Sequence, residues 1–202
     1  GRMNTDEHGS SLIEVMGLLA IAGMIAVSLM GGISLITARV KITQAQNQIT
    51  RIVKSMTTQF ASDMPSMAAD KSAKMLFEAG VYQSSDVIAG SGSYTGTNVY
   101  GSAMTIQGGP ADSDGNPYFT LTYEDLPATV CSDLLQANFG DDPSSGLKSV
   151  SVFNSDKNAS TVFEWDKPDA DTHPAHKLIP DAGESFDACS SKKNNITWTF
   201  YL

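Results

Sequence analysis

The chain has 202 residues and a formal net charge of −9 at pH 7, and only 17% of its residues are charged, below the ~25% typical of soluble domains. This length accommodates one ordinary globular domain plus an additional element, and it excludes two large domains. The acidity and the lack of a basic patch with interleaved aromatic residues argue against nucleic acid as a partner, because phosphate binding needs clustered Lys and Arg.

The shortage of charge is concentrated near the N-terminus. The run from Val15 to Ala38 contains no charged residue. As a helix it would measure roughly 36 Å at about 1.5 Å per residue, enough to cross a ~30 Å hydrocarbon core. It includes the pair Gly31-Gly32. Such a pair is a place where a helix bends, but an ordinary single-pass anchor also tolerates glycine, so both interpretations stay open.

The helix is expected to run from Ser10 to about Ser62, with Pro65 ending it. Its first half is apolar on all sides, whereas its second half is amphipathic. Apolar residues recur at steps of three and four: Ile49, Ile52, Val53, Met56 and Phe60. The other faces carry Gln46, Gln48, Arg51, Lys54 and Gln59. We expect the apolar stripe to be buried against a globular domain.

The remaining sequence alternates short helical and extended patterns. Helices are predicted at 70–79, 128–139 and 182–188, and strands at 103–107, 118–123, 150–153, 161–165 and 196–202. A Gly/Ser-rich loop is predicted at 89–97 and a turn at 112–117. In the last strand Ile196, Trp198, Phe200 and Leu202 share one face. The predicted fold is therefore α+β, a long N-terminal helix packed on a mainly antiparallel sheet.

The chain contains two cysteines, Cys131 and Cys189. An even cysteine count in a membrane-anchored chain with a polar outer domain favours an oxidising compartment and one disulfide. Two buried free thiols are the alternative that the sequence leaves open.

The most informative segment is Gly9-Ser10-Ser11-Leu12-Ile13-Glu14-Val15, directly before the apolar run. An ordinary secretory signal is cleaved after its apolar segment, whereas this small-residue site precedes it. Cleavage here would leave the helix on the mature protein, with a new amine at Ser10. Glu14 would then lie one helical turn from that amine. A carboxylate in such an apolar region needs a cation to neutralise it, so Glu14 is a functional candidate.

This segment resembles the class III signal of type IV prepilins. The resemblance implies that a peptidase cleaves between Gly9 and Ser10 and that Ser10 is N-methylated. It further implies that Glu14 pairs with the amine of an adjacent subunit and sets the axial register of assembly. The leader differs from the usual basic type in carrying Asp6 and Glu7.

Later segments are similar to parts of type IVb pilins, bundlin among them. The similar segments are 98–102, before a strand; 126–135, around Cys131; and 188–202, from the second cysteine to the closing strand. By this resemblance, Cys131 and Cys189 bound the D-region that forms much of the filament surface. The implied division is a leader at 1–9, a transmembrane or filament-core helix at 10–38, its amphipathic half at 39–64, and a head at 65–202 with the D-region at 131–189.

The function that the resemblance implies is that of a pilus subunit, not an enzyme. The precursor would lie in the bacterial inner membrane, with a prepilin peptidase and the pilus assembly machinery as partners. The mature chain would polymerise with itself into an extracellular type IVb pilus for attachment, aggregation or conjugation. The alternatives are a minor pilin, a type II secretion pseudopilin, or a single-pass anchored binding protein. Pseudopilins often carry a calcium site in place of a disulfide, so the cysteines favour a pilin.

Patterns for metal, cofactor or catalytic chemistry are weak. The segment 112–116 resembles the start of a calcium loop, but Pro117 occupies the sixth position, where glycine is required, and Tyr123 the twelfth, where glutamate is required. His173 and His176 have no cysteine or carboxylate framework at zinc spacing. No nucleophile elbow and no phosphate-binding glycine loop are found in the sequence. We therefore expect no metal, no cofactor and no catalytic site.

Overall fold

The structure, a computed structural model, describes residues 40–61, 69–90, 93–109, 111–137, 139, 146–164 and 179–202. The chain divides into two compact units, Gly1–Lys41 and Ile42–Leu202. All described residues except 40 and 41 belong to the second unit, which comprises residues 42–60 of the first helix and the head. The predicted leader and the charge-free run Val15–Ala38 lie outside the described residues. Among the helices that are described, none is both long and apolar enough to span a membrane.

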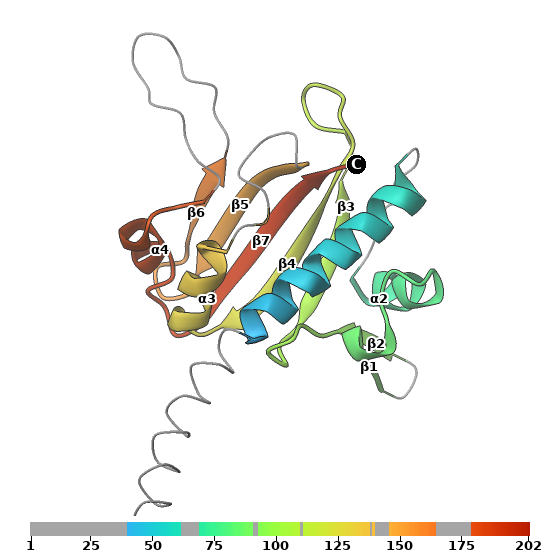
Figure 1. Ribbon diagram of the computed structural model, residues 1–202, viewed down its shortest axis with the longest axis horizontal. Helices are drawn as coiled ribbons and strands as arrows, with labels where there is room; N and C mark the ends of the chain where they lie inside the picture. Colours follow the sequence, from blue (N-terminus) through green and yellow to red (C-terminus); the bar gives the residue numbers. More distant parts are fainter. Residues whose placement is uncertain are drawn as a thin grey trace, which may run out of the picture. The chain divides into compact units, whose positions relative to one another are not determined.

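The head is built on a five-stranded sheet in which every neighbouring pair of strands is antiparallel. In spatial order the strands are β3 (Met104–Gly109), β4 (Tyr118–Leu126), β7 (Asn194–Tyr201), β5 (Leu147–Asn154) and β6 (Ala159–Glu164). The last strand in the sequence therefore occupies the centre of the sheet (Figure 1). The antiparallel sheet and the α+β class predicted from the sequence are confirmed.

Alternation along the strands places one face of the sheet in the core. In β4 and β7 the buried residues face each other across the strands, as in the register pairs Leu121 with Trp198 and Tyr123 with Ile196. The opposite face carries hydroxyl side chains, and Thr122 Oγ1 lies 2.8 Å from Thr197 Oγ1. A sheet covered on one face and solvated on the other is expected to alternate in this way.

The first helix, described over residues 40–60, lies in front of the covered face of the sheet in Figure 1. Its predicted apolar stripe is buried as expected: Ile49, Ile52 and Met56 are at most 1% exposed. Val53 and Phe60 are partly buried against the same core. One prediction for this helix is wrong. Gln48, placed on the polar side from its spacing, is only 6% exposed.

Beyond the first helix, α2 (Ala69–Glu78) ends before Gly80, which has a positive φ of 78°. A short η1 (Ser84–Asp86) leads into a separate hairpin of β1 (Val87–Gly90) and β2 (Ser93–Gly96). This corrects the predicted loop at 89–97. The glycine-rich composition suggested a loop, but Gly96 is required where the hairpin meets β3. A Cβ atom on Gly96 would lie 2.2 Å from the carbonyl oxygen of Met104.

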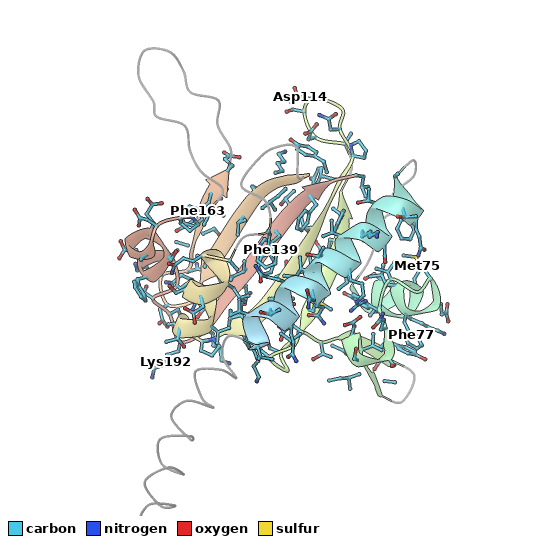
Figure 2. The ribbon with its side chains drawn as sticks, viewed as in Figure 1. Met75, Phe77, Asp114, Phe139, Phe163 and Lys192 are labelled. Carbon is cyan, nitrogen blue, oxygen red and sulfur yellow. A yellow bond between two sulfur atoms is a disulfide. The ribbon has the colours of Figure 1, made fainter. Side chains whose placement is uncertain are left out.

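Two short helices, α3 (Ala128–Leu135) and α4 (Ala182–Ala188), complete the head. The bounds of α4 are those predicted, whereas α3 is shorter than the predicted 128–139. The chain leaves α3 at Gln136, and the ring of Phe139 packs edge-on against Trp198 with centroids 5.3 Å apart. Figure 2 shows Phe139 between α3 and the first helix, over the sheet. The ring is partly buried against the core, and this contact takes the place of a further helical turn.

Candidate functional site

The predicted site residues fall into two groups. Gly9, Ser10 and Glu14 lie outside the described residues, so the structure does not test cleavage, methylation or axial register. Cys131 and Cys189 are described. The functional geometry that can be described is therefore that of the disulfide-bounded region and of the junction between helix and head.

Cys131 and Cys189 form a disulfide with their Cα atoms 5.7 Å apart. Cys131 lies in α3 and Cys189 is the C-cap of α4, and both are at most 1% exposed. The bond joins two helices that are distant in the sequence and closes a loop of sequence separation 58 that contains β5, β6 and α4. The single disulfide predicted from the cysteine count is therefore present, and the free-thiol alternative is excluded.

Two buried asparagines fix the chain around the second cysteine. Asn154 in β5 and Asn194 in β7 are register partners at the end of the sheet. The Nδ2 of Asn194 donates to the carbonyl oxygens of Cys189 and Ser191. The Nδ2 of Asn154 donates to the Oγ of Ser190 at 2.9 Å. Since buried main-chain groups must be paired, these amides hold the turn after α4 in one conformation.

The junction between the helix and the head is a polar cluster of Gln48, Arg51, Asp86 and Tyr123. Asp86, at the end of η1, is 1% exposed. Its carboxylate accepts from Gln48 Nε2 at 2.8 Å, Arg51 Nη2 at 2.6 Å and the main-chain N–H of Gln83 at 2.8 Å. A buried carboxylate is stable only when a cation and hydrogen-bond donors neutralise it. Arg51, with 30% of its side chain exposed, supplies the cation from the helix.

Gln48 extends this cluster into the core of the head. Its Nε2 also donates to the carbonyl oxygen of Thr97, and its Oε1 accepts from the hydroxyl of Tyr123 in β4. Burial, and then the nearby charges, raise the pKa of Tyr123 well above its usual value, so its hydroxyl keeps its proton at neutral pH. One residue of the helix is thus bonded to η1, to the segment after β2 and to the central sheet.

The spacing of Gln48 along the helix is itself a signal for its burial. Gln48 stands four residues before Ile52 and eight before Met56, so it lies on the edge of the apolar stripe rather than opposite to it. Its partner Asp86 is an isolated acid between predicted elements, and nothing local indicates that it is buried. The pairing depends on tertiary contacts between residues 38 positions apart.

The turn at 98–102 borders the junction. The Oδ1 of Asn98 accepts from the main-chain N–H groups of Tyr100 and Ser102, and its Nδ2 donates to the Oγ of Ser102 at 2.7 Å. Burial first, and the charge of Asp133 second, raise the pKa of Tyr100 to about 12. The segment that resembled a pilin motif is thus a compact turn organised by one buried asparagine.

The calcium-like segment 112–116 forms a turn. The Oδ1 of Asp112 accepts from the N–H groups of Asn116 and Asp114, and the first of these bonds is the main reason why the pKa of Asp112 is lowered. Lys148 Nζ lies 3.6 Å from Asp112 Oδ2, and it also lies over the ring of Tyr118. The positive charge beside the Asp112 carboxylate in this calcium-like turn is therefore that of Lys148. Within the described ranges, no three His, Cys, Asp or Glu residues are grouped to hold a metal.

Comparisons with known proteins bear on the whole described region. A family model described as PilS N terminal matches residues 36–200. The structure is similar to that of a type IV b pilin from Salmonella typhi, with a TM-score of 0.52 and 18% identity, covering 79% of this chain and 96% of that one. It is also similar to TcpA, a type IV pilin from the Vibrio cholerae El Tor biotype, with a TM-score of 0.50 and 19% identity, covering 79% and 98%. No curated protein sequence matches. At such identities, the two structures establish a shared fold.

Proposed function

Because this chain belongs to the PilS N terminal family and has the type IV pilin fold, we propose that it is the structural subunit of an extracellular type IVb pilus. The observation that carries the proposal is the extent of the family match, which runs from the end of the charge-free segment through the helix and the whole head. A single-pass anchor with an unrelated binding domain would have no reason to preserve this combination.

In the proposed pathway the precursor lies in the inner membrane through the run Val15–Ala38. A prepilin peptidase cleaves between Gly9 and Ser10, and Ser10 becomes the methylated N-terminus. The assembly machinery then transfers the helix from lipid into the core of a growing filament. The head, residues 65–202, forms the filament surface, and the disulfide-bounded D-region is part of that surface.

Glu14 has the central role in this proposal. Transfer of an apolar helix from lipid to a helix bundle gains little hydrophobic free energy, because both surroundings are apolar. Specific polar pairing must therefore select the position of each new subunit. The carboxylate of Glu14, paired with the Ser10 amine of a neighbour, would provide such a pair, since leaving either charge alone in the core is costly.

The test uses the full chain, expressed with its assembly machinery, and electron microscopy of sheared surface material. We expect filaments from the unaltered chain and from the control Ser11→Ala, and a loss of nearly all filaments from Glu14→Ala. Mass analysis of the filament subunit should give a chain that begins with a methylated Ser10. Filaments that retain residues 1–9, or normal filament yield from Glu14→Ala, would refute the proposal.

A further inference from the structure

The tip of the hairpin formed by β5 and β6 contains an acceptor pattern for N-linked glycosylation. Asn158 is followed by Ala159, which is not proline, and by Ser160, whose hydroxyl stands at the position that the pattern requires. Asp156 stands two residues before Asn158 and adds a carboxylate. Patterns this short also arise by chance, so the meaning of this one depends on where the fold places the acceptor amide.

Residues 155–158 form the turn between the two strands, and all of them are exposed. The buried side chain of Asn154 holds the base of this turn, because its Oδ1 accepts from the main-chain N–H groups of Asp156 and Lys157, both at 3.1 Å. Asn158 has a φ of 45°, in the left-handed region that asparagine adopts more readily than most residues. Its side-chain amide makes no hydrogen bond to any residue that the structure describes. An enzyme can therefore reach this amide in the folded head.

The two flanking residues offer groups by which an enzyme can recognise the site. The carboxylate of Asp156 is exposed and forms no ion pair within the described ranges, so a cation of a transferase can bind it. Ser160 is exposed near the start of β6, and its register partner is Phe153 in β5. Since β6 is the edge strand of the sheet, its other side pairs with no described strand and leaves room for an enzyme (Figure 1).

A second copy of the pattern, at residues 195–197, provides an internal comparison. Asn195 lies in β7, the central strand, and its Oδ1 accepts from the main-chain N–H of Asp125 at 3.0 Å. The hydroxyl of Thr197 is hydrogen-bonded to β4 across the sheet. Lys193 stands two residues before Asn195, so no carboxylate precedes this copy at that position. Of the two acceptors, Asn158 is the one that the fold leaves accessible.

We propose that Asn158 is N-glycosylated by an oligosaccharyltransferase that recognises Asp156 and Ser160 beside it, and that the glycan covers the open edge of the sheet. The inference rests on the proposed function in that the head must reach the outer side of the inner membrane. In this step the Nδ2 of Asn158 forms a bond to the anomeric carbon of an oligosaccharide, and the bond between that carbon and a polyprenyl diphosphate breaks. The polyprenyl diphosphate leaves with the bonding electrons and the amide loses one proton, so nothing is oxidised or reduced.

The edge strand itself supplies a reason for such a glycan. β6 contains no lysine and no proline, the residues that commonly protect an edge strand, and its only charged residue, Glu164, is its last. Val162 is 54% exposed on this strand. An unprotected edge strand can pair with a strand of another molecule. A bulky hydrophilic chain attached directly before β6 would hinder such pairing between the heads of neighbouring filaments.

Mass analysis of the full chain, isolated from its own cells, tests the site. We expect the peptide that contains Asn158 to be heavier by one oligosaccharide. Asn158→Asp, Asp156→Asn and Ser160→Ala should each abolish this added mass or lower its occupancy several-fold, whereas Ser160→Thr should keep it, because threonine supplies the same hydroxyl. Aspartate also tolerates a left-handed backbone, so Asn158→Asp should leave the near-ultraviolet circular dichroism unchanged. Asn116→Asp, the same change at an exposed asparagine outside the pattern, is the matched control and should keep the added mass.

The results for the site and for the filament function can be told apart. Filaments built from subunits of unmodified mass, or with the oligosaccharide on Asn195, would overturn the site and leave the proposed function intact. A chain that carries the oligosaccharide at Asn158 in cells that never form filaments would keep the site and remove the proposed function.

Electron microscopy of the filaments tests the role of the glycan at the edge. Filaments of Asn158→Asp should lie in lateral bundles several-fold more often than those of the unaltered chain or of Asn116→Asp. Adding Val162→Lys to Asn158→Asp should restore separate filaments, because a lysine on the edge strand opposes pairing. Equal bundling with and without the glycan would overturn this role.

Discussion

Replacement of Asp86 by alanine is the most direct test of how the head is attached to its helix. The change removes an acceptor of three hydrogen bonds at a position that is 1% exposed. Loss of one partner of a buried ion pair costs about 3–5 kcal/mol. Arg51 is 30% exposed and can turn toward water, so we reduce the expected loss of stability to about 2–4 kcal/mol. For a head of this size that loss corresponds to a fall in Tm of roughly 5–15 °C.

The measurement is thermal unfolding of the full chain in detergent, followed by near-ultraviolet circular dichroism, which reports the packed aromatic core rather than the helix content. The matched control is Asp114→Ala, since Asp114 is an exposed acid at the tip of the turn between β3 and β4 (Figure 2). A double-mutant cycle with Arg51→Met isolates the ion pair, and the coupling should exceed about 1 kcal/mol. If Asp86→Ala lowers the Tm no more than Asp114→Ala does, the junction is not the stabilising contact inferred here.

Three further predictions concern the stability of the head. Replacement of Cys131 and Cys189 by serine should lower the free energy of unfolding by about 4 kcal/mol on the chain-entropy estimate, as measured by denaturant unfolding of the full chain. Reductant should lower the stability of the unaltered chain in the same way. Equal stability of the oxidised and reduced chains would contradict the prediction. The pKa of Tyr100 is raised to about 12, so the folded state keeps this proton to a higher pH than the unfolded state does. The resulting stability is complete below pH ~10 and is lost as the pH rises toward 12. Absorbance at 295 nm and the Tm measured against pH should both show this loss. Gly96→Ala should prevent the close approach of β2 to β3 and destabilise the head, because the added Cβ atom would lie 2.2 Å from the carbonyl oxygen of Met104. Gly90→Ala is the control, since its Cβ atom would make only an ordinary contact and a compatible Gly→Ala change is stabilising by about 0.4–1 kcal/mol. Similar stabilities of the two variants would refute the packing argument.

Local patterns predicted the fold well where one face of an element is apolar. The stripe of the first helix, the alternation of β7 and the bounds of α4 follow from residue spacing, and the structure agrees with each. The hairpin β1–β2 was missed because its strands consist mostly of small and polar residues. Its pairing is supported from outside, for example by the ring of Phe77 in α2 stacked on Tyr94 at 5.8 Å. Such support depends on tertiary contacts, which no window of sequence contains.

The candidate site likewise has one part that the sequence predicts and one part that it does not. The disulfide was predictable because two cysteines in an oxidising context have few alternatives. The junction was not, because Asp86 is an ordinary surface residue by type and becomes buried only when η1 and the helix meet. Chemistry that depends on two distant segments cannot be read from either one.

The junction also resolves an ambiguity that the apolar stripe leaves open. Ala45, Ile49, Ile52 and Met56 repeat with the period of the helix, so a helix shifted by one turn, about 5.4 Å, would present a similar apolar face to the sheet. The hydrogen bonds of the junction favour the observed axial position, because a shift would remove the donors of Gln48 and Arg51 and leave the buried carboxylate of Asp86 with only the main-chain N–H of Gln83. Polar groups within an apolar seam are best attested as devices that set register.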